Sequence, residues 1–285
     1  MLSSFSNWLV LAPLWIIGLV IFGGLIGAVG IAGVLRRRHT QKSARGGGAA
    51  ESSEQGITVS AVMGLLALLV AFTFSIALER FDTRRANVLH EANAIGTTYL
   101  RAQLLEEPHR ARVSKLLVAY TDARVALATA HRGPEQRALL AASDRLLVDL
   151  WTATVAAYPS IRTYGFSHSF VDSMNNLIDM DASRKAGRQA HVPSVVFLAL
   201  FLYLFVAAGV ISYVVAAKRS RQTAWVLFML LGLFLLLIID IDRATSGGIT
   251  ESQEPMLQLQ AFLKAQPPLS FDRFNAPAEP SPGAR

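Results

Sequence analysis

Four long apolar stretches without a charged residue constrain the fold of this chain more than any other feature. They cover residues 14–35, 57–78, 194–217 and 223–239. An α-helix rises 1.5 Å per residue, so about 20 apolar residues cross the roughly 30 Å hydrocarbon layer of a bilayer. A soluble protein of this length buries one such helix, but not four. The sequence therefore predicts an all-α membrane protein with four transmembrane spans and the lipid bilayer as its first partner.

The composition agrees with this class. Hydrophobic residues make up 52% of the chain and charged residues 16%, whereas a soluble domain carries about 25% charged residues. Cysteine is absent, which excludes disulfides and cysteine-based zinc sites. The first 35 residues carry no charge, so the first apolar stretch lacks the basic region of a signal peptide. We expect this stretch to remain as the first span.

Basic residues flank the spans on one side. The 36–56 segment, a Gly/Ser-rich linker, has five basic and two acidic residues, a net charge of +3, and the 218–222 loop also carries +3. Short basic loops stay in the cytoplasm, so both chain ends and the long 79–193 segment are expected outside, in the periplasm of a bacterium. Long segments translocate largely regardless of charge, which leaves a cytoplasmic 79–193 domain as the alternative.

Glycine and proline divide the parts outside the bilayer. They predict helices at about 108–130, 134–157 and 166–188 in the extramembrane domain, and one short helix at 255–265 in the tail. The whole chain is expected to comprise an N-terminal segment with span 1 (1–35), a linker (36–56), span 2 (57–78), a helical extramembrane domain (79–193), span 3 (194–217), a short loop (218–222), span 4 (223–242) and a tail (243–285).

The helix of span 2 is expected to continue beyond the membrane, because Gly96 is the only helix breaker between Phe72 and Ala102. Polar and small side chains recur on it every three or four residues. This polar stripe is either a solvated face or the lining of a pore that several copies share. The candidate pore residues are Phe72, Thr73, Phe74, Arg80, Arg84, Asn87, Glu91, Thr98 and Arg101.

A second set of charges lies where spans 2 and 4 end. Arg85 falls on the apolar stripe of the span-2 helix and needs a partner there, because a buried unpaired charge is costly. Span 4 ends in an Asp-Ile-Asp-Arg run at the same expected membrane face. We expect its aspartates to pair with an arginine of residues 80–85 in a structural clamp, with a water-filled path as the alternative. The candidate clamp residues are Arg85, Asp240, Asp242 and Arg243.

Motifs for catalysis, metals and nucleic acids are missing. The chain has no P-loop, no dinucleotide fingerprint and no His-Glu-x-x-His. Ser167, His168 and Asp172 do not suit a catalytic triad, because Ser167 neighbours the histidine and points elsewhere. Basic and aromatic residues are not interleaved as nucleic-acid binding requires. We therefore expect no enzyme activity, no cofactor, no metal site and no nucleic-acid partner.

Several motifs resemble one family. They are Phe74-Ser75, Arg80-Phe81-Asp82, Arg84-Arg85, the run EANAIGTTYLRA from Glu91 to Ala102, Asp240-Ile241-Asp242-Arg243 and Gly247-Gly248-Ile249. With these motifs, over roughly residues 57–265, the chain resembles the bacterial membrane proteins classed as bestrophin-like, a domain of unknown function. It departs from the family at Ala244, where a proline is common, and at 251–255, where a Val-Ser-x-x-Pro run is common.

The resemblance implies likeness to bestrophins, which are pentameric anion channels with four spans per subunit and a helical soluble domain. The first hypothesis is thus a homo-oligomeric channel of the bacterial inner membrane that passes small anions. Arg80 and Arg84 would attract the anions, and Phe72 or Phe74 would form a constriction. Glu91 on the same stripe argues against simple anion selectivity. Bestrophins keep their helical domain in the cytoplasm, whereas the charge rule places this one outside. The second hypothesis is a non-conducting envelope module that senses or scaffolds, and the third is an intramembrane enzyme.

Overall fold

The described part of the chain is built from helices. A computed structural model describes residues 2–42, 49–130, 133–214, 218–243 and 247–272. No strand occurs within these ranges, so the predicted all-α class is confirmed. The elements in chain order are α1 (Leu2–Leu11), α2 (Leu14–Lys42), α3 (Ala49–Ala102), α4 (His109–Thr129), α5 (Pro134–Ile161), α6 (Ser167–Gln189), α7 (Ser194–Val214), α8 (Lys218–Asp242), α9 (Glu254–Ala265) and the 3-10 helix η1 (Pro268–Asp272).

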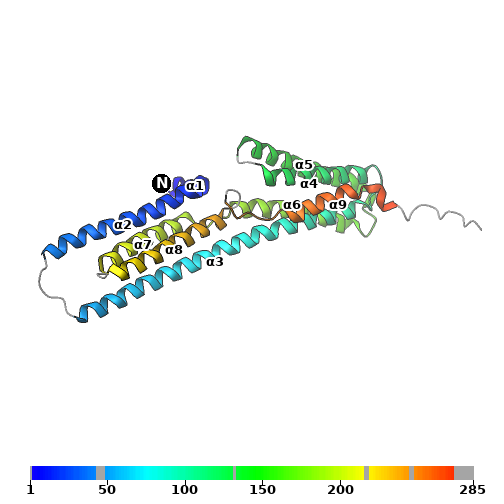
Figure 1. The fold of residues 1–285 in the computed structure, drawn as a ribbon. Helices are drawn as coiled ribbons and strands as arrows, with labels where there is room; N and C mark the ends of the chain where they lie inside the picture. The colour runs from blue at the N-terminus through cyan, green and yellow to red at the C-terminus, as the bar shows by residue number, and fades with distance from the viewer. Residues whose placement is uncertain (1, 43–48, 131–132, 215–217, 244–246, 273–285) are drawn as a thin grey trace, which may run out of the picture. The chain divides into compact units, whose positions relative to one another are not determined.

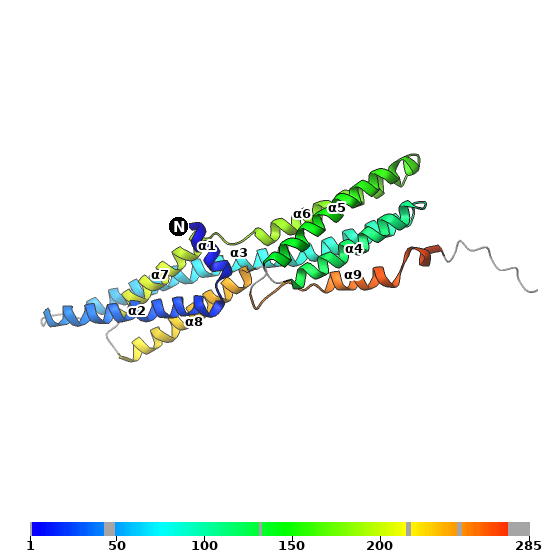
Figure 2. The same ribbon diagram turned by 90° about the horizontal axis from the view of Figure 1, so that it is seen from above.

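The helices divide between two compact units (Figures 1 and 2). The membrane unit comprises residues 1–82 and 189–250 and contains α1, α2, the first part of α3, α7 and α8. The bundle unit comprises residues 83–188 and 251–285 and contains the second part of α3, then α4, α5, α6, α9 and η1. Each unit therefore collects segments that are far apart in the sequence.

Four helical stretches among the described residues are long and apolar enough to cross a membrane. They are Leu14–Arg38, Val59–Ala102, Ser167–Val214 and Gln222–Asp242. These stretches contain the predicted blocks 14–35 and 223–239 completely, and they contain residues 59–78 and 194–214 of the other two blocks. A helix satisfies its backbone N–H and C=O groups internally, which is what the hydrocarbon layer requires. The chain thus has the helices of a multi-pass membrane protein.

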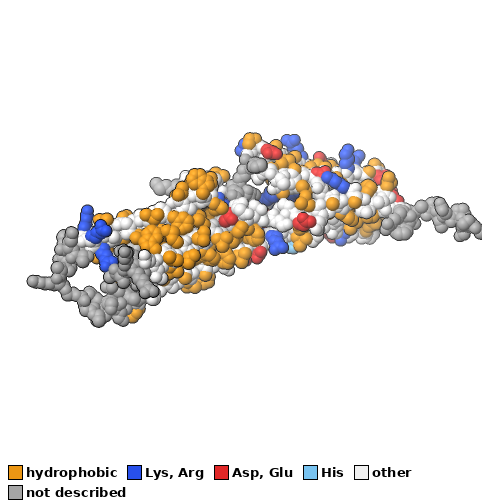
Figure 3. Space-filling view, in the orientation of Figure 1, with side chains coloured by type: hydrophobic (Ala, Val, Ile, Leu, Met, Phe, Trp, Pro, Cys, Tyr) orange, Lys and Arg blue, Asp and Glu red, His pale blue; other side chains and the backbone are white. Residues whose placement is uncertain are grey.

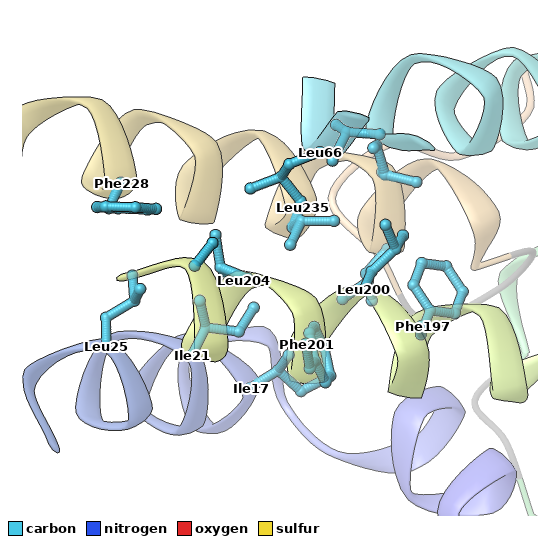
Figure 4. Close-up of a cluster of buried hydrophobic side chains, with 14 of the residues drawn as sticks. Ile17, Ile21, Leu25, Leu66, Phe197, Leu200, Phe201, Leu204, Phe228 and Leu235 are labelled. Carbon is cyan, nitrogen blue, oxygen red and sulfur yellow. The ribbon is translucent and has the colours of Figure 1, made fainter. Parts of the chain in front are cut away.

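Apolar side chains from α2, α3, α7 and α8 converge in the core of the membrane unit (Figure 4). Ile17, Ile21 and Leu25 recur at four-residue steps along α2 and are fully buried, as are Leu66 of α3 and Leu235 of α8. The outward side of these helices is apolar as well, and Figure 3 shows hydrophobic side chains spread over the visible face of this unit. Helices that are apolar on all sides suit a lipid surrounding.

The bundle unit has its own core, formed by α3, α4, α5, α6 and α9. α4 packs along α5, and α9 lies against α4. On α4 the buried residues recur at three- and four-residue steps, so one face of this helix points inward. The sequence of that face includes Val113, Leu117, Tyr120, Arg124 and Leu127. Since Tyr120 is polar and Arg124 is charged, the centre of the bundle is not purely apolar.

Proline and glycine set most helix boundaries where the sequence predicts them. Gly133 has φ 146°, a conformation that favours glycine, and Pro134 then opens α5. The predicted end of this helix before Pro159 is wrong, because α5 continues two residues beyond that proline. A proline removes only one backbone hydrogen bond, so it is tolerated near a helix end. Pro13 separates α2 from α1, a short helix that the sequence pattern does not predict.

Helical backbone also covers both ends of the predicted 36–56 linker. α2 runs to Lys42 and α3 begins at Ala49, and residues 43–48 lie outside the described residues. α8 begins at Lys218, the start of the predicted second cytoplasmic loop. Basic residues at these helix ends are compatible with the role of topology signals that the sequence assigns to them.

Candidate functional site

Within the membrane unit, the predicted polar stripe of α3 begins on the side that faces the chain's own packing. Thr73 is only 3% exposed, and its hydroxyl donates to the Leu69 carbonyl at 2.8 Å. Phe74 packs against Phe234 of α8, with ring centroids 5.3 Å apart. Phe72, in contrast, is 60% exposed. Each residue turns a helix by about 100°, so these neighbours point in different directions.

Beyond the apolar stretch, the polar stripe of α3 points into the bundle unit. Arg84 Nε donates to Glu251 Oε1 at 2.7 Å, and both side chains are buried. Asn87, Thr98 and Arg101 each donate to a backbone carbonyl of α6. Arg80, which belongs to the membrane unit, is half-buried. The buried members of this stripe can line a water path only if that path runs between the chain's own helices.

Glu91 is the centre of a buried network of charges. Its carboxylate lies 2.7 Å from Arg124 Nε, accepts the Tyr120 hydroxyl at 2.8 Å and also pairs with Arg184. Arg124 Nη1 lies 3.1 Å from Asp181 Oδ1. None of these five residues is more than 3% exposed. Charges from α3, α4 and α6 therefore meet in the middle of the bundle.

The charge network reaches the bundle surface and the C-terminal segment. Lys185 of α6 pairs with Asp181 and with Asp144 of α5, whose side chain is 57% exposed. Arg184 Nη2 donates to Gln253 Oε1 at 2.6 Å, immediately before α9. Five segments of the bundle unit thus share one connected set of polar side chains.

Burial and neighbouring charges together set the protonation of Tyr120 and Arg124, the two α4 residues of the network. Burial and the negative charge of Glu91 raise the pKa of Tyr120 well above its usual value, so the phenol stays neutral and donates its proton. Burial disfavours the charged guanidinium of Arg124, but the negative charges of Glu91 and Asp181 outweigh this effect and raise its pKa. If a buried ion pair of this network loses one partner, the other partner is left as an uncompensated buried charge. Packings of α3, α4 and α6 that separate the partners are therefore disfavoured.

The arrangement supplies charge but no metal site. Within the described residues, no three His, Asp or Glu side chains could hold a metal ion. The carboxylates of Glu91 and Asp181 face guanidinium and ammonium groups, whereas calcium or magnesium requires several oxygen ligands. The buried network can therefore stabilise the bundle and bias the local electrostatic potential.

At the end of α8, two aspartates bind backbone amides. Asp240 Oδ1 accepts the Gly248 N–H at 2.7 Å. Gly247 lies so close that a Cβ atom there would be 2.4 Å from the same carboxylate, which only glycine avoids. Asp242 Oδ1 accepts the Val192 N–H at 2.9 Å. The two carboxylates thus fix the segments before α7 and after α8.

The arginines of the predicted clamp have different surroundings. Arg243 donates to the carbonyl oxygens of Leu9 and Ala12, so it fixes the turn between α1 and α2. Arg85 has an exposed side chain, although the sequence pattern places it on an apolar stripe. A pair between an α8 aspartate and an arginine of residues 80–85 stays a prediction.

Sequence reasoning singled out Glu91 but missed the residues that surround it. Tyr120 and Arg124 lie in phase with the buried apolar residues of α4, and Asp181 and Arg184 lie in phase with those of α6. A charged residue in phase with an apolar stripe is the available signal, because it indicates a buried charge that needs a partner.

Most of the chain, residues 9–256, matches the family model of the bestrophin-like domain. No curated protein matches the chain. A solved structure of a bacterial bestrophin homolog from Klebsiella pneumoniae, carrying one substitution, is similar with a TM-score of 0.61 at 14% identity, over 86% of this chain and 98% of that chain. A second structure of that homolog has a TM-score of 0.60 at 13% identity, over 86% and 97%. A third, with another substitution, has a TM-score of 0.56 at 14% identity, over 90% and 99%. These similarities show a shared fold and confirm the family resemblance.

Proposed function

Since this chain belongs to the bestrophin-like family, we propose that several copies of it assemble in the bacterial inner membrane into an ion channel. The observation that carries the proposal is one exposed side of α3 in the membrane unit, where small and polar residues recur every three or four positions. This open face of α3 consists of Ser60, Gly64, Ala67, Ala71, Ser75, Glu79 and Asp82, all of which are exposed.

The open face differs from the exposed residues beside it. Only Leu68 and Leu78 interrupt it, whereas the adjacent exposed strip is bulky and apolar and suits lipid. Small and polar residues at membrane depth either let another helix approach closely or face water. Both situations arise when further copies of the chain surround α3. The adjacent lipid-type strip consists of Leu65, Leu69, Phe72 and Ile76.

The charges near the open face lead to opposite expectations for the conducted ion. The family resemblance implies small anions, which Arg80 would attract, whereas Arg84 is buried and paired with Glu251. Glu79 and Asp82 lie on the open face itself, and a ring of carboxylates around a pore favours cations. Arg80 is half-buried and lies about 100° around the helix from Glu79. Whether the channel prefers anions or cations therefore indicates which side of α3 lines the ion path.

Ion flux in liposomes tests the proposal. Purified protein is reconstituted, and the reversal potential is measured under a potassium chloride gradient. We expect flux above that of empty vesicles. A reversal potential near the chloride value that shifts in Arg80→Gln assigns the path to the side of α3 that carries Arg80. A reversal potential near the potassium value that shifts in Glu79→Gln assigns the path to the open face. Glu106→Gln, an exposed change in the bundle unit, serves as the control. Folded protein without flux would exclude a channel.

The basic helix ends support a periplasmic bundle unit. Arginines 36–38 and the basic start of α8 would then lie in the cytoplasm. The chain has no cysteine, so a single Asp149→Cys change on exposed α5 gives one labelling site. We expect a membrane-impermeant maleimide to label it in cells whose outer membrane is permeabilised. Labelling only after the inner membrane is opened would support the cytoplasmic alternative.

One observation favours the alternative of a scaffolding module. Val148, Trp151, Val155 and Tyr158 lie on one side of α5 and are between 39% and 65% exposed. An apolar helix face of this kind outside the membrane spans is typical of a protein contact. In an affinity purification from a membrane extract, a scaffolding module should bind one partner protein, and Val155→Lys should abolish that binding. This result, together with the absence of ion flux, would support the scaffolding function instead.

A further inference from the structure

We propose that a groove between α4 and α9 binds an amphipathic carboxylate, of which a short fatty acid is the simplest example. The groove is formed entirely by residues of the bundle unit and has a volume of about 450 Å³. Sites for small molecules usually measure about 300–1,000 Å³ and combine an apolar lining with a few placed polar groups. This groove has both features.

The apolar part of the groove is preformed. Tyr99 and Leu263 line it and are 1% and 2% exposed, so they are fixed by the packing of the bundle. The Tyr99 hydroxyl donates to the Gln266 carbonyl at 2.7 Å, and its ring packs against Phe271 with centroids 6.3 Å apart, so this wall of the groove is held in place. Pro267 and Pro268 complete this wall and carry no N–H group that a ligand would have to satisfy. The surface suits an alkyl chain.

Two donors stand together at the side of the groove that α4 forms. The hydroxyl of Ser114 is 2% exposed and accepts from Gln103 Nε2 at 3.0 Å, while its own proton has no acceptor among the described residues. Lys115, the next residue, is exposed and makes no ion pair within the described part of the chain. A carboxylate accepts hydrogen bonds and carries one negative charge, so it matches a hydroxyl donor beside an ammonium group.

The remaining charge in the groove does not favour a cation. Asp122 accepts Gln260 Nε2 at 2.6 Å and pairs with Lys264 Nζ at 3.1 Å, so its negative charge is already compensated. A purely apolar ligand would leave the buried Ser114 donor unsatisfied, which costs free energy. The groove therefore selects a ligand with one negative end and an apolar tail.

Binding of octanoate to the full-length protein in lipid nanodiscs tests this site, with empty nanodiscs subtracted. We expect saturable binding by isothermal titration calorimetry, and binding of octanol that is at least about tenfold weaker because it lacks the charge. Lys115→Gln and Ser114→Ala should each weaken octanoate binding by at least about tenfold. Arg112→Gln removes an exposed positive charge from the same helix and should leave binding unchanged.

Three results would overturn the proposal. In the first, octanoate binds nanodiscs that contain the protein no more strongly than empty nanodiscs. In the second, the protein binds octanoate and octanol with equal affinity. In the third, Lys115→Gln and Arg112→Gln lose the same amount of affinity for octanoate. The last result would show that octanoate responds to overall charge rather than to the groove. Hydrogen exchange of α4 in each variant shows that the bundle unit is folded, so loss of binding is assigned to the site itself.

Discussion

Replacing Glu91 with glutamine is predicted to loosen the bundle unit. The amide has nearly the same shape as the carboxylate but no charge, so Arg124 and Arg184 lose the group that neutralises both. Removing one partner of a buried ion pair costs about 3–5 kcal/mol, because the other charge stays buried. Arg124 keeps Asp181 at 3.1 Å, and Arg184 keeps Gln253 at 2.6 Å. We therefore expect the lower end of this range, about 3 kcal/mol.

Hydrogen–deuterium exchange of the full-length protein in nanodiscs measures this loss locally. A decrease of about 3 kcal/mol in the free energy of opening speeds the exchange of central α4 and α6 amides roughly a hundredfold. Glu106→Gln changes an exposed carboxylate and should stay within about 0.5 kcal/mol of the wild type. The double variant Glu91→Gln/Arg184→Gln should recover part of the loss, because it also removes one buried charge. Equal α4 exchange in Glu91→Gln and Glu106→Gln would refute the reasoning.

Three further variants probe separate features. The pKa of Tyr120 is raised in the folded bundle, so the unfolded chain loses this proton first and stability should fall as the pH rises above about 10. In thermal unfolding scans, the melting temperature of Tyr120→Phe should fall less steeply with pH than that of the wild type. Equal pH dependence in the two proteins would contradict this prediction. Gly24→Val should lower the melting temperature, at a cost of about 1–3 kcal/mol, because a Cβ atom there lies 2.4 Å from the Phe205 ring. Gly27→Val should leave the melting temperature unchanged, because a Cβ atom there meets no atom within 4 Å. Equal melting temperatures of the two variants would argue against the packing of Phe205 on Gly24. Arg243→Gln should speed amide exchange in α1 alone, because it removes the hydrogen bonds to the carbonyl oxygens of Leu9 and Ala12. Faster exchange throughout the membrane unit would point to another role for Arg243.

The helices of this chain were largely predictable from its sequence, because long apolar stretches, proline and glycine act locally. α1 escapes prediction, since ten residues without a strong pattern do not distinguish a helix from a loop. The continuation of α3 beyond the apolar stretch was also predictable, but the contacts of its polar stripe were not. Periodicity shows which residues share a face of a helix, and it does not show what that face meets.

The contacts of the candidate site depend on residues that are distant in sequence. Glu91 meets Arg124 and Arg184, which lie 33 and 93 residues further along the chain, so no local pattern links them. The aspartates of α8 bind backbone N–H groups, which every residue except proline possesses and which therefore leave no mark in a sequence. Arg84 is one of three arginines that the sequence offers as partners for the aspartates of span 4, and it pairs with Glu251 inside the bundle unit.

The open face of α3 can be tested most directly by cysteine accessibility, because the chain has no native cysteine. Ser75 is exposed on the open face, while Thr73, two residues away, is 3% exposed and points to the other side of the helix. Each residue is changed to cysteine, and ion flux in liposomes is measured before and after a charged methanethiosulfonate reagent. We expect the reagent to reduce flux through Ser75→Cys and to leave Thr73→Cys unchanged. Inhibition of Thr73→Cys alone, or of neither variant, would contradict an ion path along the open face.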